Sequence, residues 1–128
     1  MGDDPAKPAV AGPIELDLTA MEELADGDSA VLADLIATFV RHTADAIVNA
    51  RAAIGAGNSV EAARIAHTCI GFTATIGITA MVPTLRQLER AVRHDHRDET
   101  IHLLAEWERQ FELIREALRA WKDRSNLT

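Results

Sequence analysis

Residues 63–78 read ARIAHTCIGFTATIGI, and this stretch decides the fold class. Its apolar residues recur at intervals of four, three and four positions, as Ile65, Cys69, Phe72 and Ile76. That spacing places them along one face of an α-helix. Asn58 followed by Glu61 has the spacing of a helix start, and Gly77 ends or bends the helix. We therefore predict a helix between these signals, with one side packed into a core.

Helical periodicity continues on both sides of this segment. Large apolar residues recur at helical spacing over about residues 29–56, 79–92 and 99–122. Thr19 and Glu22 have the spacing of a capping box, which indicates a short helix over residues 19–25. No segment alternates with the period of a strand over a useful length. Because short loops join the long helices, we predict an all-α fold, an antiparallel up-down four-helix bundle with a short extra N-terminal helix.

Length and proline distribution indicate one domain with a tail. A chain of 128 residues suits a single domain. Residues 1–14 hold three of the four prolines and no apolar periodicity, so we expect a flexible N-terminal tail there and the bundle over residues 15–124. The one cysteine, Cys69, excludes an internal disulfide. It fits a reducing compartment, and we expect a cytoplasmic protein.

The charge of the chain is unevenly distributed. Lys and Arg number 13 against 20 Asp and Glu, and the net charge of −7 argues against unaided nucleic-acid binding. Residues 1–40 hold one basic against nine acidic groups, residues 41–97 seven against four, and residues 98–128 five against seven. The middle segment is therefore locally positive, which suits a partner surface built around carboxylates.

The stretch between Arg64 and Arg86 contains no Asp, Glu, Lys or Arg. Its length is close to that of a membrane span. It also contains His67, five threonines, two glycines and Pro83, so it is too polar and too broken to lie in hydrocarbon. We expect no membrane segment and interpret the stretch as a docking surface framed by arginines.

The predicted helix has an unusual face around His67. This face carries Arg64, His67, Ile70, Gly71, Ala74 and, after the turn, Ile78. Gly71 costs about 1 kcal/mol relative to alanine in mid-helix, and it lies one turn after His67. Small apolar residues around an imidazole indicate a surface that permits close approach. Three plainer alternatives stay open: an exposed histidine without a role, a glycine for close helix packing, and a patch of Ile70, Ala74 and Ile78 that packs under another element.

Residues 66–78, AHTCIGFTATIGI, resemble the signature of histidine-containing phosphotransfer (HPt) domains. That signature has a run of Ala-His-Thr-Leu-Lys-Gly-Ser, a second glycine six residues after the first, and a Leu-Glu pair in the next helix. The matching positions here are His67, Thr68, Gly71, Gly77, Leu88 and Glu89. The resemblance extends over about residues 17–122, because the helix lengths and the short first helix fit as well.

The resemblance implies a function in a phosphorelay. An HPt histidine accepts a phosphoryl group from a receiver-domain aspartate or a histidine kinase and passes it to another receiver. His67 would carry the group, and Gly71 would leave room for it and for the loops of the partner. Neutral imidazole is a good nucleophile near neutral pH. The receiver would supply Mg²⁺ and carboxylates, so we expect a monomeric phosphocarrier, not an enzyme, without cofactor, metal or general base of its own.

One position departs from the signature. Where the family usually has Lys, and sometimes Gln, this chain has Ile70, which cannot hydrogen-bond phosphoryl oxygens. Substitute cations are Arg64, one turn before His67, and two arginines that we expect at about the height of His67 on the neighbouring helix. The predicted partner-docking residues are Arg64, Thr68, Ile70, Ala74, Ile78, Arg86 and Arg90. Ile70 also favours an alternative function, a non-catalytic adaptor that docks a receiver or kinase without phosphotransfer.

A third interpretation is a helical bundle that binds a metal or another ligand. Possible metal-ligand spacing occurs at His94, His96, Asp98 and His102. These residues straddle a turn and a helix start, and Asp98 is more simply a cap. The chain also lacks the inward-facing Glu and His pairs of metal-binding bundles. We therefore expect no metal site, and we place Cys69 and the stripe Trp107, Phe111 and Trp121 in the core.

Overall fold

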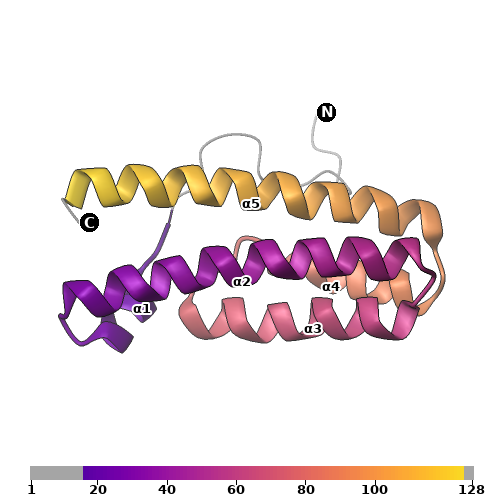
Figure 1. Cartoon of the computed structure of the whole chain (residues 1–128), viewed down its shortest axis with the longest axis horizontal. Helices are drawn as coiled ribbons and strands as arrows, with labels where there is room; N and C mark the ends of the chain where they lie inside the picture. The colour runs from indigo at the N-terminus through magenta and orange to yellow at the C-terminus, as the bar shows by residue number, and fades with distance from the viewer. Residues whose placement is uncertain (1–15, 126–128) are drawn as a thin grey trace, which may run out of the picture.

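The computed structural model describes residues 16–125, and every regular element in this range is helical. The elements are α1 (Thr19–Ala25), α2 (Ser29–Gly55), α3 (Ser59–Ile76), α4 (Val82–Arg93) and α5 (Arg97–Ser125). Figure 1 shows α2 to α5 running side by side in alternating directions, with α1 at the end where α2 begins. The predicted all-α bundle with a short first helix is confirmed. The tail predicted over residues 1–14 lies outside the described residues.

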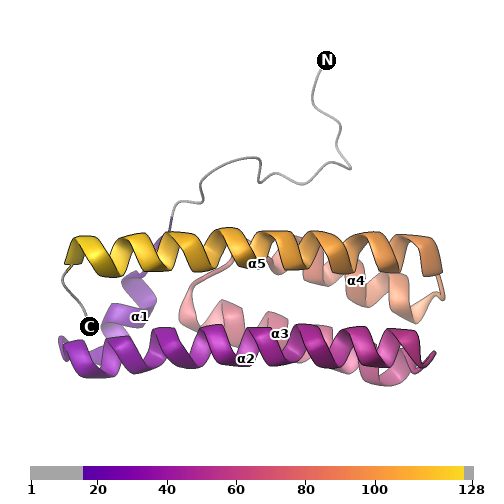
Figure 2. The same cartoon turned by 45° about the horizontal axis from the view of Figure 1, so that its top comes forward.

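The helices follow one another around the bundle. α3 packs against α2 and α4, and α5 packs against α4 and α2, while α1 contacts α2 and α3. In Figure 2, α5 and α2 lie in front, with α3 and α4 behind them. The side of the bundle between α2 and α5 is therefore opposite the side between α3 and α4.

Polar side chains cap the first turns of two of the long helices, one of them at Asn58, where the sequence predicts a helix start. Asp28 Oδ1 accepts hydrogen bonds from the backbone N–H groups of Ala30 and Val31 at 2.9 and 3.2 Å. Asn58 Oδ1 accepts from the N–H of Glu61 at 3.1 Å. These bonds satisfy donors that a helix start leaves unpaired.

The capping box predicted at the start of α1 is wrong. Leu18 is the N-cap residue of α1 and makes no side-chain cap, and Asp17 Oδ1 accepts from the N–H of Thr19 at 3.0 Å. The acceptor therefore lies two residues before the expected one, because an aspartate competes well with threonine for this role. α5 is also longer than the predicted 99–122, beginning at Arg97 and ending at Ser125.

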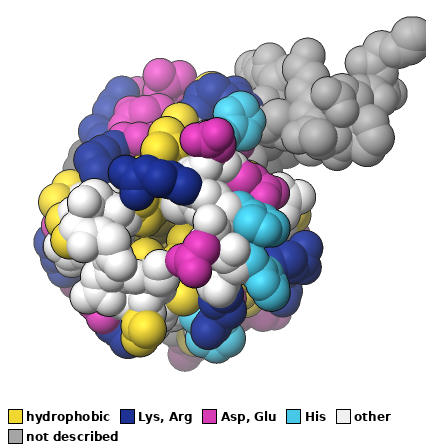
Figure 3. Space-filling view, turned by 90° about the vertical axis from the view of Figure 1, so that its right-hand side faces the viewer, with side chains coloured by type: hydrophobic (Ala, Val, Ile, Leu, Met, Phe, Trp, Pro, Cys, Tyr) yellow, Lys and Arg dark blue, Asp and Glu magenta, His cyan; other side chains and the backbone are white. Residues whose placement is uncertain are grey.

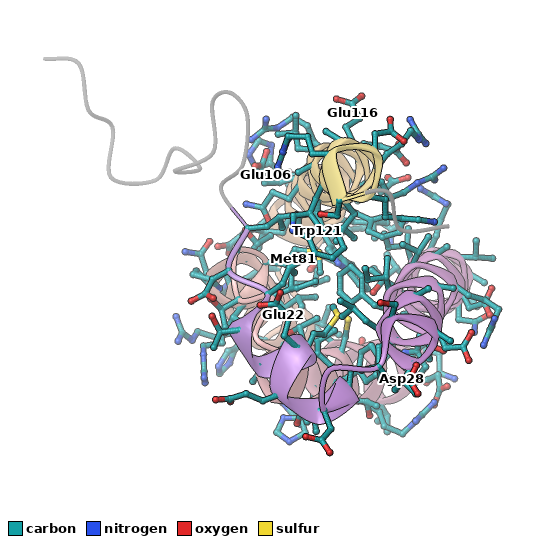
Figure 4. All side chains as sticks on the ribbon, turned by 90° about the vertical axis from the view of Figure 1, so that its left-hand side faces the viewer. Glu22, Asp28, Met81, Glu106, Glu116 and Trp121 are labelled. Atoms are coloured by element: carbon teal, nitrogen blue, oxygen red, sulfur yellow. The ribbon has the colours of Figure 1, made fainter. Side chains whose placement is uncertain are left out.

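The core is formed where the apolar faces of all five helices meet. On α3 the predicted stripe is confirmed, because Ile65, Cys69 and Ile76 are buried and Phe72 is half-buried. Burial raises the pKa of the Cys69 thiol to about 12, so this cysteine is a core residue with an unreactive thiol. Figure 4 looks along the bundle from the α1 end and shows Met81 and Trp121 pointing inward and Glu116 pointing outward.

Gly77 ends α3 and lets α1 pack closely. Its φ of +85° is a left-handed conformation, and the N–H of Ile78 donates to the carbonyl of Thr73 at 3.1 Å. A Cβ at this position would also lie 3.0 Å from the Cβ of Ala20 in α1. Both the turn and the contact with α1 therefore require glycine, which agrees with the sequence prediction that Gly77 ends the helix.

Candidate functional site

His67 lies in the middle of α3, on the side that faces α4. Its side chain is 73% exposed, and its Nδ1 lies 3.3 Å from Oε1 of Glu89 in α4. The contact forms because the closely packed α3 and α4 run antiparallel, so residues 22 positions apart in sequence lie at the same height. The site therefore joins an accessible imidazole to a carboxylate of the neighbouring helix.

Glu89 also holds a cation. Its side chain is only 17% exposed, and its Oε2 accepts from Arg93 Nη2 at 2.7 Å and Nε at 3.1 Å. Burial raises the pKa of the Glu89 carboxyl, but hydrogen bonds from Arg93 and His67 outweigh it, so the pKa lies below its usual value. Glu89 is therefore ionised at neutral pH, at the centre of the line Arg93–Glu89–His67.

The carboxylate determines which ring nitrogen of His67 is available. An ionised carboxylate only accepts hydrogen bonds, so the imidazole Nδ1 donates to Glu89. In the neutral ring the other nitrogen, Nε2, then carries the lone pair. This tautomer makes Nε2 the nucleophilic nitrogen of an exposed ring, so the contact of Nδ1 with Glu89 can persist while Nε2 reacts.

Sequence reasoning assigned no role to Glu89. The residue stands in the Leu88-Glu89 pair of the motif, so the signal was present, but its contact with His67 depends on the register of α3 against α4. Arg93 joins the site through its hydrogen bond to Glu89. The sequence prediction did not include Arg93 among the substitute cations.

The surface beside His67 is open, as predicted. Gly71 is exposed, and a Cβ built on it would meet nothing within 4 Å. Thr68 and Ala74 are exposed as well. Arg64 and Thr68 line a groove of about 280 Å³ between α3 and α2. The "His67 face" is defined here as Arg64, His67, Thr68, Gly71 and Ala74.

Ile70 and Ile78 do not belong to this face, which corrects the sequence prediction. Their exposures are 9% and 3%, and both are members of the hydrophobic core. The physical reason is that α3 packs against both α2 and α4 and so buries two adjacent stripes, where the prediction allowed one. The alternative, that this patch packs under another element, is therefore correct for the two isoleucines and wrong for Ala74, which is exposed.

The structure gives the three predicted substitute cations different surroundings. Arg64 donates to its helical neighbour Glu61 at 2.8 and 2.6 Å. Arg90 lines a recess at the α4–α5 turn with His94, His96 and Glu99, so it is directed to another part of the surface. Arg86 is exposed on α4, and its part in docking stays a prediction. The cation joined to the site is Arg93, acting through Glu89.

The histidines of the α4–α5 turn form a separate surface group. The rings of His94 and His96 lie 5.9 Å apart, and His96 Nδ1 is 3.4 Å from Oε1 of Glu99. Figure 3 shows histidine side chains gathered on one side of this end of the bundle, beside a hollow with an apolar floor. Within residues 16–125 no group of three His, Cys, Asp or Glu side chains is arranged to hold a metal ion.

These observations define a class of protein, a four-helix bundle that presents a histidine on an open helical face. A model of the Hpt domain matches residues 34–121, so the chain belongs to the Hpt domain family. Hpt domains are phosphocarriers of two-component phosphorelays that interact with receiver domains and kinases. No curated protein and no solved structure matches the chain. Among the helices described, none is both long and apolar enough to span a bilayer.

Proposed function

We propose that His67 accepts a phosphoryl group from a receiver-domain aspartate or a histidine kinase and passes it to another receiver. The observation that carries this proposal is the exposed imidazole held by Glu89 at 3.3 Å beside an uncovered Gly71. Membership of the Hpt family supports histidine phosphotransfer as the activity. The His67 face offers a docking surface for the partner, which brings its own Mg²⁺ and carboxylates.

The chemistry requires only one nucleophile from this chain. The Nε2 lone pair of His67 attacks phosphorus, a N–P bond forms, and the bond from phosphorus to the aspartyl oxygen of the partner breaks. The partner recovers its carboxylate, while the imidazole keeps its Nδ1 proton against Glu89. The positive charge that develops on the ring is stabilised by that carboxylate. Transfer to the next receiver is the same step in reverse.

A Gly71→Ala variant is expected to change stability and transfer in opposite directions. Alanine has open space here and favours the helix, so the free energy of unfolding should rise by about 0.5–1 kcal/mol. The same methyl group lies one turn from His67 and obstructs the partner, so the initial transfer rate should fall several-fold. Urea denaturation and a transfer assay measure the two effects. A variant that is stabilised but transfers at the wild-type rate contradicts the clearance role.

The second candidate function is an adaptor that docks a receiver or kinase without phosphotransfer. Ile70 favours it, because an apolar residue stands at the position of the usual cation. Arg64 and Arg93 are engaged by Glu61 and Glu89. A pairwise transfer assay against the receivers and kinases of the same organism decides between the two functions, because only a phosphocarrier becomes labelled on His67.

An Ile70→Lys variant tests the missing cation directly. Ile70 is at the edge of the core, so a lysine can bury its stem and extend its ammonium to the surface near His67. We expect the transfer rate to rise, by about tenfold if the ammonium contributes one charge-assisted hydrogen bond to the phosphoryl oxygens. Ile70→Met, which changes the packing without adding charge, is the matched control. Equal rates for the two variants would show that Ile70 does not limit transfer.

A further inference from the structure

A basic furrow runs between α2 and α5. Its volume is about 390 Å³, and its cationic lining consists of Arg41, Arg115, Arg119 and Lys122. Ile36, Val40 and Leu118 supply apolar lining between these charges. Asp123 is its one acidic lining residue among the described residues. We use "basic furrow" for this site, a concentration of positive charge on a chain whose net charge is −7.

The spacing of basic residues along α5 concentrates positive charge on the furrow. Arg115, Arg119 and Lys122 are spaced at i, i+4 and i+7, which puts them on one face of the helix. Arg41 approaches from α2 on the other side of the furrow. Arg115 also contacts Glu112 at 3.3 Å, so part of its charge is compensated. Residues 98–128 are net acidic, and only the folded chain brings these four cations together.

The furrow is separate from the phosphotransfer site. His67 and Glu89 lie between α3 and α4, whereas the furrow lies between α2 and α5 on the opposite side of the bundle. Figure 2 views the molecule from the side of α2 and α5. A partner in the furrow therefore leaves the His67 face accessible to a receiver.

We infer that the basic furrow binds an acidic amphipathic helix of a partner protein. The cations of the furrow favour an acidic partner by charge complementarity. The apolar lining between the cations requires that the partner helix also carry an apolar stripe. The lining of α5 extends over eight residue steps, about 12 Å at 1.5 Å per residue, which matches about two turns of a docked helix. Nucleic acid fits less well, because its phosphate backbone offers no apolar stripe to the lining between the cations. A lipid surface fits less well because it is flat and the site is a furrow between two helices.

A synthetic peptide tests the inference on the full chain. The probe is a fluorescent peptide of about 14 residues with leucines at i, i+3, i+4 and i+7 and glutamates elsewhere. The control peptide carries lysine in place of every glutamate. By fluorescence anisotropy we expect the acidic peptide to bind at least tenfold more tightly than the basic one. We also expect its binding to weaken between about 50 and 300 mM salt, as screening requires.

Charge-reversal variants locate the binding. Arg41→Glu combined with Arg119→Glu should weaken binding of the acidic peptide at least tenfold. Arg97→Glu, a single reversal at an exposed position at the far end of α5, should alter it less than twofold, and Arg119→Glu alone is the variant to compare with it. Amide chemical shifts of the wild-type chain provide a readout that needs no variant, and the peptide should perturb α2 and α5 more than α3 and α4. Circular dichroism shows whether each variant is folded.

Several results overturn the inference. They are equal binding of the two peptides, equal weakening by Arg97→Glu, and shifts centred on the His67 face. Binding to vesicles rich in phosphatidylserine that the double variant abolishes would indicate a lipid surface instead. Concentration-dependent dimers abolished by the double variant would indicate a second copy of this chain. A His67→Gln variant should bind the peptide like wild type, so the furrow and the phosphotransfer proposal fail independently.

Discussion

A His67→Gln variant is expected to accept no phosphoryl group from any phosphorylated receiver or kinase that labels the wild-type chain. Glutamine lacks a ring nitrogen with a nucleophilic lone pair, so the acceptor atom itself is removed. The side chain is 73% exposed and its described polar contact is with Glu89, so the free energy of unfolding should stay within about 0.5 kcal/mol of wild type. Loss of labelling is then a loss of chemistry. Incubation with a radiolabelled phosphoreceiver, followed by electrophoresis, measures it.

His102→Gln is the matched control for this experiment. His102 is an exposed histidine on α5, so the same substitution there should leave labelling unchanged. Persistent labelling of His67→Gln would assign the phosphoryl group to another residue and remove His67 from its proposed role. A wild-type chain that binds receivers but is labelled by none of them would favour the adaptor.

The burial pattern of α3 shows how far sequence periodicity alone predicts the fold. The stripe Ile65, Cys69 and Ile76 is buried as its spacing requires. Ile70 and Ile78 are buried as well, although the pattern placed them on a docking face. A helix in a four-helix bundle contacts two neighbours, so its buried surface is wider than one stripe, and a single sequence does not show which flank is covered.

The candidate site also has features that the sequence predicts and features that only the fold shows. His67 and Gly71 could be selected from the sequence as candidates, because their proposed roles depend on residue type and on spacing within one helix. The partners of His67 depend on which turn of α4 lies opposite α3. Glu89 contacts His67, whereas the next residue, Arg90, lines a different recess. The basic furrow depends on the pairing of α2 with α5, which are far apart in sequence. Contacts within a helix were predictable, and contacts between helices required the fold.

A Glu89→Gln variant is expected to slow phosphorylation of His67 by about tenfold, which corresponds to a loss of about 1.4 kcal/mol of transition-state stabilisation. The amide keeps the shape of the side chain and can still accept from Nδ1, but it carries no charge. The ring then loses the carboxylate that stabilises its developing positive charge, and Arg93 loses its ion pair. Initial rates of labelling by a phosphoreceiver, at saturating receiver, measure the change.

The pH dependence follows from the lowered pKa of Glu89. Because the pKa of the Glu89 carboxyl in the folded chain lies below its usual value, the side chain keeps its charge at neutral pH and loses it only as pH falls through that lowered pKa. The rate advantage of wild type over Glu89→Gln should therefore be constant near neutral pH and disappear in acid. Glu99→Gln is the control, because Glu99 makes the same kind of contact with His96, at 3.4 Å, away from the site. If Glu99→Gln slows labelling as much as Glu89→Gln does, the effect is one of overall charge, and Glu89 does not position His67.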